Sequence, residues 1–226
     1  MRTYVVKQGD TLSNIAIQLC GDWMRYPEIA RVNGIEDVNL IKVDQVLQVP
    51  GWWPVRAVWP VRVRETAYYR FGSIYRSGRW QGRLHPGVDW HVREGAGVRA
   101  VGPGVVRVQG YEANGYGFYT VLEHRMRIAQ YRPVRAWSLY AHMVKAGPPV
   151  GTVVEGGEPI GLEGVSGAAG TPHLHFELKK SADLGLYGRL DEETLQAWYW
   201  DPQVVLDRAW MQPVWCWACP GQEWET

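Results

Sequence analysis

Four histidines and one aspartate, in three short segments, are the residues of this chain best suited to chemistry. They are His85 and Asp89 in His-Pro-Gly-Val-Asp, His142 in Leu-Tyr-Ala-His-Met, and His173 and His175 in His-Leu-His. A catalytic zinc ion is held by three nitrogen or oxygen side chains, and its fourth position stays open for a water whose pKa falls to roughly 7. The five side chains would supply three such ligands and leave two imidazoles beside the metal.

The spacing within the segments indicates a site built on strands and loops. Residues i and i+2 of a strand face the same way, so His173 and His175 would both point into one site. A proline and a glycine disfavour a helix between His85 and Asp89, and an extended stretch or loop would bring those two together. The sequence contains no His-Glu-x-x-His pair, so the zinc-protease signature carried on a helix is absent.

Residues from about 84 to 178 resemble the lysostaphin-type (LytM-like) zinc endopeptidases, which cut peptidoglycan cross-bridges or stem peptides. The matching segments follow one another in the order 85–89, 95–100, 104–106, 115–124, 140–143, 158–161, 164–167 and 173–177. The resemblance implies a mainly β catalytic domain with an antiparallel sheet, similar to a barrel or sandwich, and an open groove that holds zinc.

Carried over residue by residue, the resemblance implies one zinc ion per chain, held by His85, Asp89 and His175. His142 and His173 would then flank the zinc-bound water and the scissile carbonyl. A neutral imidazole can accept the water proton and later return it, because its pKa lies near the working pH. The other imidazole, if protonated, would hydrogen-bond the oxyanion. Which histidine plays which part stays open.

Three further polar residues near these segments have more modest interpretations. His124 is expected to be a structural histidine at a strand end. His91 lies two residues after Asp89 and would either orient that carboxylate or form part of the pocket wall. Glu177 is expected to hold a neighbouring strand or loop rather than to act as a base.

Two segments depart from the family. The connection over 125–137 is long and carries four arginines and no acidic residue. A basic rim beside the cleft would attract the carboxylates of stem peptides, and a solvated hairpin tip is an equal alternative. Residues 181–200 contain a helix-like run over 191–198, whose acidic first turn suits a helix N-terminus. This excursion is expected to cap one side of the barrel or line the groove.

The first fifty residues form a separate unit with a strand–helix–helix–strand pattern. Either Asp10 or Thr11 would cap the first helix, and the second helix runs from about 27 to 33. This pattern resembles a LysM module, which binds the N-acetylglucosamine-containing glycan of peptidoglycan or chitin. The family positions, taken as candidate glycan contacts, are Gly9, Asp10, Thr11, Leu12 and Asn33.

The expected organisation is a LysM module at 1–50, a Trp/Pro linker at 51–59, a zinc endopeptidase domain at 60–207 and a Trp-rich tail at 208–226. The tail is too apolar for a free terminus and should dock on its own domain or on a partner. Cys216 and Cys219 form one Cys-x-x-Cys without a second pair, so a local disulfide or two buried thiols is expected rather than a four-thiolate zinc site.

The composition of the chain disfavours some classes of binding partner. The chain has 226 residues, with 24 Lys and Arg against 23 Asp and Glu. A net charge of +1 favours neither nucleic acid nor a membrane surface, and no window approaches the roughly 20 apolar residues of a membrane span. The N-terminus has no apolar signal-peptide core. A phage-encoded protein, released through a membrane pore or carried by a virion, is therefore expected more than an ordinarily secreted one.

Together these features predict a zinc-dependent endopeptidase that hydrolyses peptide bonds in bacterial peptidoglycan and is held on the wall by its LysM module. The alternative is a phage tail or virion component, in which the LysM module is an assembly adaptor, the tail contacts virion proteins and the peptidase assists wall penetration. A third possibility is a non-catalytic activator, as in family members that lack metal ligands; the complete ligand set argues against it.

Overall fold

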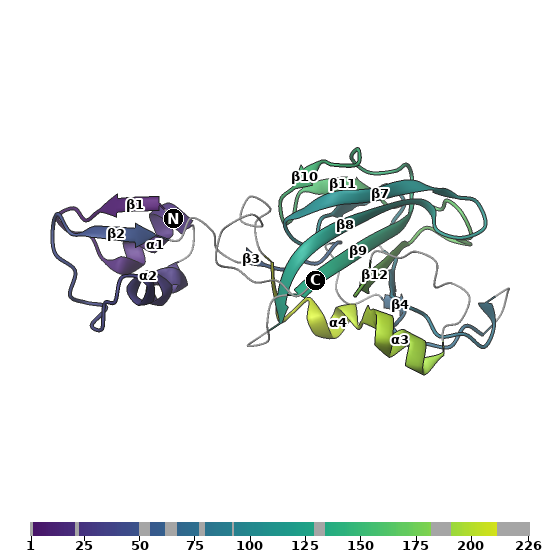
Figure 1. Cartoon of the computed structure of the whole chain (residues 1–226). Helices are drawn as coiled ribbons and strands as arrows, with labels where there is room; N and C mark the ends of the chain where they lie inside the picture. The colour runs from purple at the N-terminus through teal and green to yellow at the C-terminus, as the bar shows by residue number, and fades with distance from the viewer. Residues whose placement is uncertain are drawn as a thin grey trace. The chain divides into compact units, whose positions relative to one another are not determined.

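The computed structural model describes residues 2–20, 23–49, 55–61, 67–76, 80–91, 93–128, 134–181 and 191–211. The chain divides into two compact units, Met1–Pro54 and Val55–Thr226, which are shown in Figure 1 and described separately below.

The first unit is a two-stranded sheet packed on two helices. Its elements in chain order are β1 (Arg2–Val5), α1 (Leu12–Cys20), the 3-10 helix η1 (Trp23–Arg25), α2 (Tyr26–Val32) and β2 (Val46–Val49). β1 and β2 pair antiparallel. The strand–helix–helix–strand prediction is confirmed, with the 3-10 turn as an addition that the sequence pattern did not indicate.

The helical stripe of α1 explains why this small unit folds. Leu12, Ile15 and Ala16 recur at helical spacing and are buried against Ile29 of α2 and Leu47 of β2. Burying each large aliphatic side chain stabilises the fold by roughly 1.5–3 kcal/mol.

The second unit is built mainly from strands. These are β3 (Val55–Arg56), β4 (Ala67–Tyr69), β5 (Val88–Trp90), β6 (Gly97–Arg99), β7 (Gly104–Glu112), β8 (Gly117–Ile128), β9 (Val134–Met143), β10 (Val153–Val154), β11 (Pro159–Leu162), β12 (Leu174–Lys179), β13 (Tyr199–Trp200) and β14 (Ala209–Met211). The large sheet has the order β10-β7-β8-β9-β12-β5-β4, and β6 and β11 form a separate pair. All of these pairings are antiparallel, so the predicted mainly β, antiparallel fold is confirmed.

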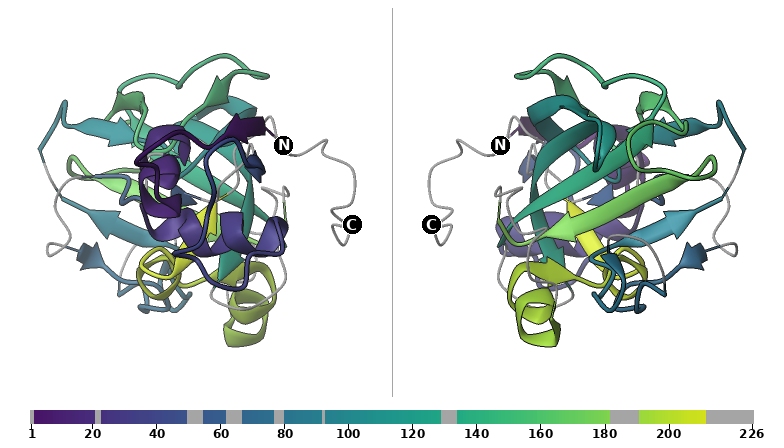
Figure 2. Two further views of the ribbon diagram at one scale, coloured as in Figure 1. Left: turned by 90° about the vertical axis from the view of Figure 1, so that its left-hand side faces the viewer. Right: turned by 90° about the vertical axis from the view of Figure 1, so that its right-hand side faces the viewer.

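Two helices follow the sheet: α3 (Glu192–Trp198) and α4 (Pro202–Val205). Figures 1 and 2 show both of them at the same margin of the sheet, away from β10. The Asp191 side chain accepts a 2.8 Å hydrogen bond from the backbone N–H of Thr194 and caps α3. The helix predicted over 191–198 is therefore confirmed.

The two faces of the large sheet have different characters, and strand alternation fixes which residue lies on which face. Along β12, Leu174, Phe176 and Leu178 are buried in the main hydrophobic core. The intervening His175 and Glu177 lie on the opposite face. A register slip of one residue would exchange the two sets, so burial of the apolar set holds the polar set in place.

The expected linker and tail both differ from the structure at one end. Residues 55–59, assigned to the linker, belong to the second unit, because β3 pairs with β14 and Trp59 packs edge-on against Trp90 with ring centroids 5.5 Å apart. Ala209–Met211, assigned to the tail, forms β14 and pairs with β8. Strand pairing satisfies backbone groups that a linker would leave to water. Residues 51–54 and 212–226, with Cys216 and Cys219, lie outside the described residues.

The basic segment 125–137 is mostly strand. Its first residues continue β8 and its last residues begin β9, whereas residues 129–133 lie outside the described residues. None of the helices in the described part of the chain is long and apolar enough to cross a membrane.

Candidate metal centre and active site

Three side-chain donor atoms converge in a buried cluster formed by His85, Asp89 and His175. The Nε2 atom of His85 lies 3.1 Å from Nδ1 of His175 and 3.2 Å from Oδ1 of Asp89. The third edge, from His175 Nδ1 to Asp89 Oδ1, measures 2.7 Å. Tetrahedral zinc with bonds of about 2.0–2.1 Å separates its ligands by about 3.3 Å, so this triangle has the size and the donor types that zinc requires.

The backbone brings these donors together through strand pairing and one glycine. Asp89 of β5 lies directly opposite His175 of β12 in the antiparallel register. The segment that carries His85 passes so close to β12 that a Cβ atom on Gly87 would lie 2.1 Å from the carbonyl oxygen of Phe176. Only glycine fits there, which explains the glycine within His-Pro-Gly-Val-Asp.

The outer nitrogens of both histidine ligands are hydrogen-bonded to oxygen atoms. Nδ1 of His85 lies 3.3 Å from the carbonyl oxygen of Arg70, and Nε2 of His175 lies 3.0 Å from Oε1 of Glu177. Each oxygen accepts a hydrogen, so the outer nitrogen carries a proton, and the inner nitrogen is the one that can offer a lone pair to a metal. This tautomer assignment suits metal binding at His85 Nε2 and His175 Nδ1.

Glu177 has a larger part in the site than the sequence indicated. Its side chain is fully buried, and Oε1 accepts a 2.7 Å hydrogen bond from the hydroxyl of Tyr116 in addition to the one from His175. Nζ of Lys179 lies 4.0 Å from the other carboxylate oxygen. Burial raises the pKa of Glu177, but His175, Lys179 and Tyr116 outweigh burial and lower it. Glu177 is therefore an ionised group that orients His175.

Contacts between the acidic and histidine side chains of the cluster shift the pKa values of both. Burial opposes ionisation of Asp89, yet His85 and His175 hold the pKa of that carboxyl well below its usual range. Burial likewise lowers the pKa of His175, but hydrogen bonds to Asp89 and Glu177 raise it to about 10. A proton then occupies Nδ1, and it must leave when a cation takes its place between the donors.

His142 and His173 form the second half of the site. Their ring centroids lie 4.6 Å apart, and the ring of His142 is 5.9 Å from that of His175. Nε2 of His173 lies 3.8 Å from Oδ2 of Asp89. The structure therefore brings all five residues singled out in the sequence into one cluster.

Both imidazoles are anchored by backbone carbonyl groups. Nδ1 of His142 lies 2.8 Å from the carbonyl oxygen of Ser166, and Nδ1 of His173 lies 2.8 Å from that of Thr171. These carbonyls accept the Nδ1 proton, so Nε2 of each ring is the available acceptor. Burial, reinforced by the neighbouring histidines, lowers the pKa of His142 to about 3, and burial also lowers that of His173 despite the Asp89 carboxylate. Both rings are neutral at physiological pH.

A β-bulge places His142. Between the paired positions Phe118↔Met143 and Thr120↔Tyr140, β9 has one more residue than β8. His142 adopts a left-handed backbone with φ of 60°, which is uncommon outside glycine. Its N–H donates a 2.8 Å hydrogen bond to the carbonyl oxygen of Tyr116, which helps to hold this conformation. Bulges of this kind re-aim side chains beside active sites.

The two remaining histidines are not part of the five-residue cluster. His124 lies on the core side of β8, where Nδ1 is 2.8 Å from the Pro103 carbonyl and Nε2 is 2.7 Å from the Ser138 hydroxyl, as a structural histidine should. Nε2 of His91 lies 3.1 Å from the hydroxyl of Thr171, in the segment that leads to His173. Its expected role, to orient Asp89 or to form part of the pocket wall, stays a prediction.

In the first unit, the candidate glycan residues have structural contacts. Gly9 has φ of 84° in the turn before α1, Leu12 is buried, and Thr11 accepts a 3.1 Å hydrogen bond at the start of the helix. The Asp10 carboxylate accepts 2.8 Å hydrogen bonds from the Tyr4 hydroxyl and from the backbone N–H of Lys7, and these bonds lower its pKa.

Asn33 joins α2 to β2 by three hydrogen bonds. Its amide group donates to the carbonyls of Ile29 and Gln48, each at 2.8 Å, and its side-chain oxygen accepts from the Gln48 N–H at 2.7 Å. The five positions therefore shape the module, and their contact with glycan stays a prediction.

Comparison with known proteins places both units. Residues 83–185 match peptidase family M23, a range that contains all five residues of the cluster, and residues 4–50 match the LysM domain. The chain joins a LysM domain to an M23 peptidase domain. It is 32% identical over 135 residues to the DD-carboxypeptidase/endopeptidase Mpg of Neisseria meningitidis, covering 60% of this chain and 28% of that protein. It is 32% identical over 129 residues to the murein hydrolase activator EnvC of Escherichia coli, covering 57% of this chain and 26% of that protein.

The M23 domain is also similar to solved structures. The catalytic domain of lysostaphin from Staphylococcus simulans is 28% identical, with a TM-score of 0.45, over 61% of this chain and 89% of that one. The chain spans little more than a quarter of the length of the Mpg and EnvC relatives.

Sequence reasoning missed the role of Tyr116 and understated that of Glu177 in the M23 domain. The i+2 spacing from His175 to Glu177 carried a usable signal, because it places both side chains on one face of β12. Tyr116 lies in the turn before β8, 61 residues from Glu177, and nothing local to it indicates the contact.

Proposed function

We propose that this protein is a zinc-dependent endopeptidase that hydrolyses peptide bonds in bacterial peptidoglycan. The observation that carries the proposal is the buried triangle of His85 Nε2, Asp89 Oδ1 and His175 Nδ1 beside two further imidazoles. These three residues would hold one zinc ion per chain. Zinc bound there would polarise the scissile carbonyl and activate a water molecule.

The two neutral imidazoles would move the proton. His142 and His173 each have Nδ1–H engaged by a carbonyl, so each can take a proton only at Nε2. An imidazole that has taken the proton of the attacking water becomes a cation with an Nε2–H donor. It can then hydrogen-bond the oxyanion and return the proton to the leaving amine. The hydrogen bonds at Nδ1 support this part equally for both rings.

The LysM domain would hold the enzyme on its polymeric substrate. A weakly binding module raises the local concentration of a linked active site on an insoluble wall. The similarity to a DD-carboxypeptidase/endopeptidase and to a murein hydrolase activator supports a cell-wall substrate for the M23 domain.

The relationship to EnvC also supports a second candidate, a non-catalytic activator of cell-wall hydrolases. The complete donor triangle favours the enzyme, because an activator has no use for two neutral imidazoles beside three converging ligands. The alternative of a phage virion component, with the LysM domain as an assembly adaptor, has no observation in the described residues that favours it.

One experiment separates these functions. Purified protein is incubated with sacculi of several wall chemotypes, with and without a zinc chelator, and the released fragments are identified by mass spectrometry. We expect new amine termini that disappear with the chelator, and the fragments would name the bond. Zinc-loaded protein that releases nothing from any wall would contradict the endopeptidase and favour the activator.

A further inference from the structure

The side chain of Ser166 bridges the ends of two neighbouring strands in the M23 domain. Phe118 of β8 and Met143 of β9 are paired in the antiparallel register, next to the bulge that contains His142. The hydroxyl of Ser166 accepts a 2.9 Å hydrogen bond from the N–H of Phe118 and donates one of 2.7 Å to the carbonyl of Met143. Both strands therefore hold this one hydroxyl.

The backbone of Ser166 binds the imidazole of His142 at the same time. Its carbonyl oxygen lies 2.8 Å from Nδ1 of His142, the residue directly before Met143. Because the hydroxyl and the carbonyl belong to one residue, the hydrogen bonds of the hydroxyl also fix the position of the carbonyl oxygen. Ser166 thus links the strand ends to one of the two imidazoles beside the metal centre.

Close backbone packing leaves the segment around Ser166 little room to shift. A Cβ atom on Gly117 would lie 2.3 Å from the Ser166 hydroxyl oxygen, and one on Gly167 would lie 2.2 Å from the Gly117 nitrogen. Both glycines have left-handed backbones, with φ of 62° and 72°. The N–H of Ala168 also donates a 2.9 Å hydrogen bond to the carbonyl of Gly115. The segment therefore packs directly on the start of β8.

The anchor of His142 differs from that of His173 in its distance along the chain. The Thr171 carbonyl that binds His173 lies two residues from it, so the local backbone can hold that contact. Ser166 lies 24 residues from His142, so contacts between separate segments must place its carbonyl. The two hydrogen bonds of the Ser166 hydroxyl are such contacts, and one of them reaches the strand that carries His142.

The left-handed backbone of His142 needs support from its surroundings. A non-glycine residue with φ of 60° is strained and keeps this conformation only where neighbouring groups hold it. The Tyr116 carbonyl accepts the N–H of His142, and the Ser166 hydroxyl binds the carbonyl of the following residue, Met143. Loss of this hydroxyl is therefore expected to loosen the bulge and the ring together.

We propose that Ser166 is a positioning residue for the reaction of the M23 domain and acts through His142. This inference rests on the proposed function. With the hydroxyl in place, the Ser166 carbonyl keeps the proton of the neutral ring on Nδ1, so that Nε2 remains the basic nitrogen. Without the hydroxyl, the ring can turn over and exchange its tautomer, and only part of the molecules hold Nε2 ready for proton transfer.

The test compares Ser166→Ala with the wild type on the zinc-loaded full chain. Nitrogen-15 NMR of labelled histidine reports the tautomer of each ring, and the His142 signals are those missing from His142→Gln. We expect the Nδ1–H form in the wild type and a mixture of both forms in Ser166→Ala. With a soluble cross-linked peptide fragment purified from sacculi, kcat should fall about 10–100-fold, whereas KM and zinc content stay at wild-type values.

Two further variants test whether the hydroxyl is the cause. Ser166→Thr keeps a hydroxyl at this position and should retain the Nδ1–H form and most of kcat. Ser13→Ala removes a hydroxyl from α1 of the LysM domain and should leave the His142 signals and kcat unchanged. If Ser166→Thr were as impaired as Ser166→Ala, the hydroxyl would not be the positioning group.

The outcomes separate the role of Ser166 from the proposed function. If the wild-type protein cleaves no fragment, the endopeptidase proposal fails, and the NMR spectra still decide whether Ser166 sets the tautomer of His142. Identical His142 spectra in Ser166→Ala and the wild type, or an unchanged kcat in a cleaving enzyme, would overturn the inference.

A fourth variant covers a failure of Ser166→Ala to fold. Ser166→Cys nearly keeps the shape of the side chain and replaces the hydroxyl by a weaker donor and acceptor. It should change the tautomer ratio and kcat in the same direction as expected for Ser166→Ala, but less. A wild-type spectrum and a wild-type kcat in Ser166→Cys would contradict the role of Ser166.

Discussion

Oε1 of Glu177 lies 3.0 Å from Nε2 of His175 and 2.7 Å from the hydroxyl of Tyr116, within a fully buried site. One carboxylate oxygen thus fixes the tautomer of His175 and ties it to the turn before β8. Because the same turn receives the N–H of His142 at the carbonyl of Tyr116, the ligand half and the imidazole half of the site share one support.

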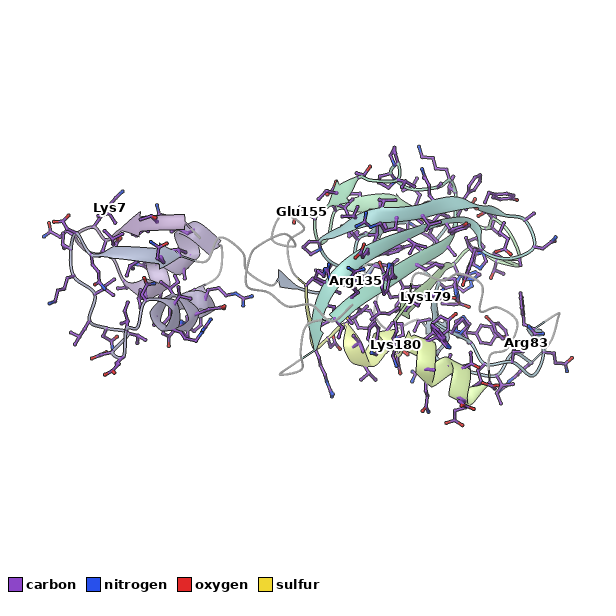
Figure 3. The ribbon with its side chains drawn as sticks, viewed as in Figure 1. Lys7, Arg83, Arg135, Glu155, Lys179 and Lys180 are labelled. Atoms are coloured by element: carbon purple, nitrogen blue, oxygen red, sulfur yellow. The ribbon has the colours of Figure 1, made fainter. Side chains whose placement is uncertain are left out.

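Replacing Glu177 by Gln should weaken zinc binding about 10–100-fold, because the amide removes the negative charge that favours the Nε2–H tautomer of His175. A competition titration against a chromophoric chelator measures this affinity. Glu155→Gln, at an exposed position labelled in Figure 3, is the matched control and should bind zinc like the wild type. An unchanged zinc affinity in Glu177→Gln would show that the carboxylate does not orient the ligand.

Variants of the metal ligands should lose zinc, whereas a variant of the neighbouring imidazoles should keep zinc and lose activity. His85→Ala and His175→Ala each remove one of three donors, so purified protein should contain far less zinc by elemental analysis. His142→Ala leaves the donors intact, so it should keep zinc and lose on the order of 10²–10⁴-fold in rate. Cleavage by His142→Ala at the wild-type rate would refute its part in proton transfer.

Gly87→Ala should destabilise the M23 domain by about 2–3 kcal/mol, because the new Cβ would lie 2.1 Å from the Phe176 carbonyl oxygen and push β5 from β12. Denaturant unfolding followed by tryptophan fluorescence measures the difference. Gly170→Ala is the control, since no heavy atom lies within 4 Å of its Cβ position, and it should stay within about 0.5 kcal/mol of wild type. Equal stability of the two variants would contradict the close approach.

Acid should weaken the fold through His124. Burial lowers its pKa to about 4 in the folded chain, against about 6.5 when unfolded, so the unfolded chain binds more protons between these values. The contribution of His124 to stability is present above about pH 6.5 and falls by about 3 kcal/mol by pH 4. Unfolding free energies of the zinc-free protein across this range should drop more steeply for wild type than for His124→Gln. Parallel curves would mean that His124 titrates normally in the fold.

Removal of residues 1–50 should weaken binding to insoluble sacculi and leave cleavage of a small soluble peptide nearly unchanged, because the two units have separate cores. Co-sedimentation with sacculi measures the first effect and steady-state kinetics the second. Zinc content serves as the control for an intact M23 domain. Equal co-sedimentation with and without the module would refute its role in targeting.

Local patterns predicted much of the molecule. The stripe of Leu12, Ile15 and Ala16 indicated α1, and Asp191 with its acidic neighbours indicated α3, because the causes of both helices lie within a few residues. The i+2 spacing of His173 and His175 indicated one shared site, and the structure brings both rings together.

Long-range contacts set the limits of that prediction. The left-handed backbone of His142 depends on a bulge that appears only when β9 pairs with β8. The end of the linker was misplaced because β3 exists only through pairing with β14, more than 150 residues later in the chain. The sequence indicated a connection over 125–137, with a basic rim or a solvated hairpin tip as equal alternatives, whereas much of this segment extends β8 and β9 and pairs Arg125 with Arg135.

In the M23 domain, the alternation of side chains along paired strands limits which insertions keep each residue on its face of the sheet. Inserting two residues into both β8 and β9 between the Glu123–Trp137 pair and the Arg125–Arg135 pair would keep every side chain on its face and move the arginines about 6.7 Å farther from the metal centre. Inserting one residue would instead turn Arg125 and Arg135 toward the apolar core. The parity of an insertion in this hairpin therefore decides whether its polar side chains stay on the face that carries the metal centre.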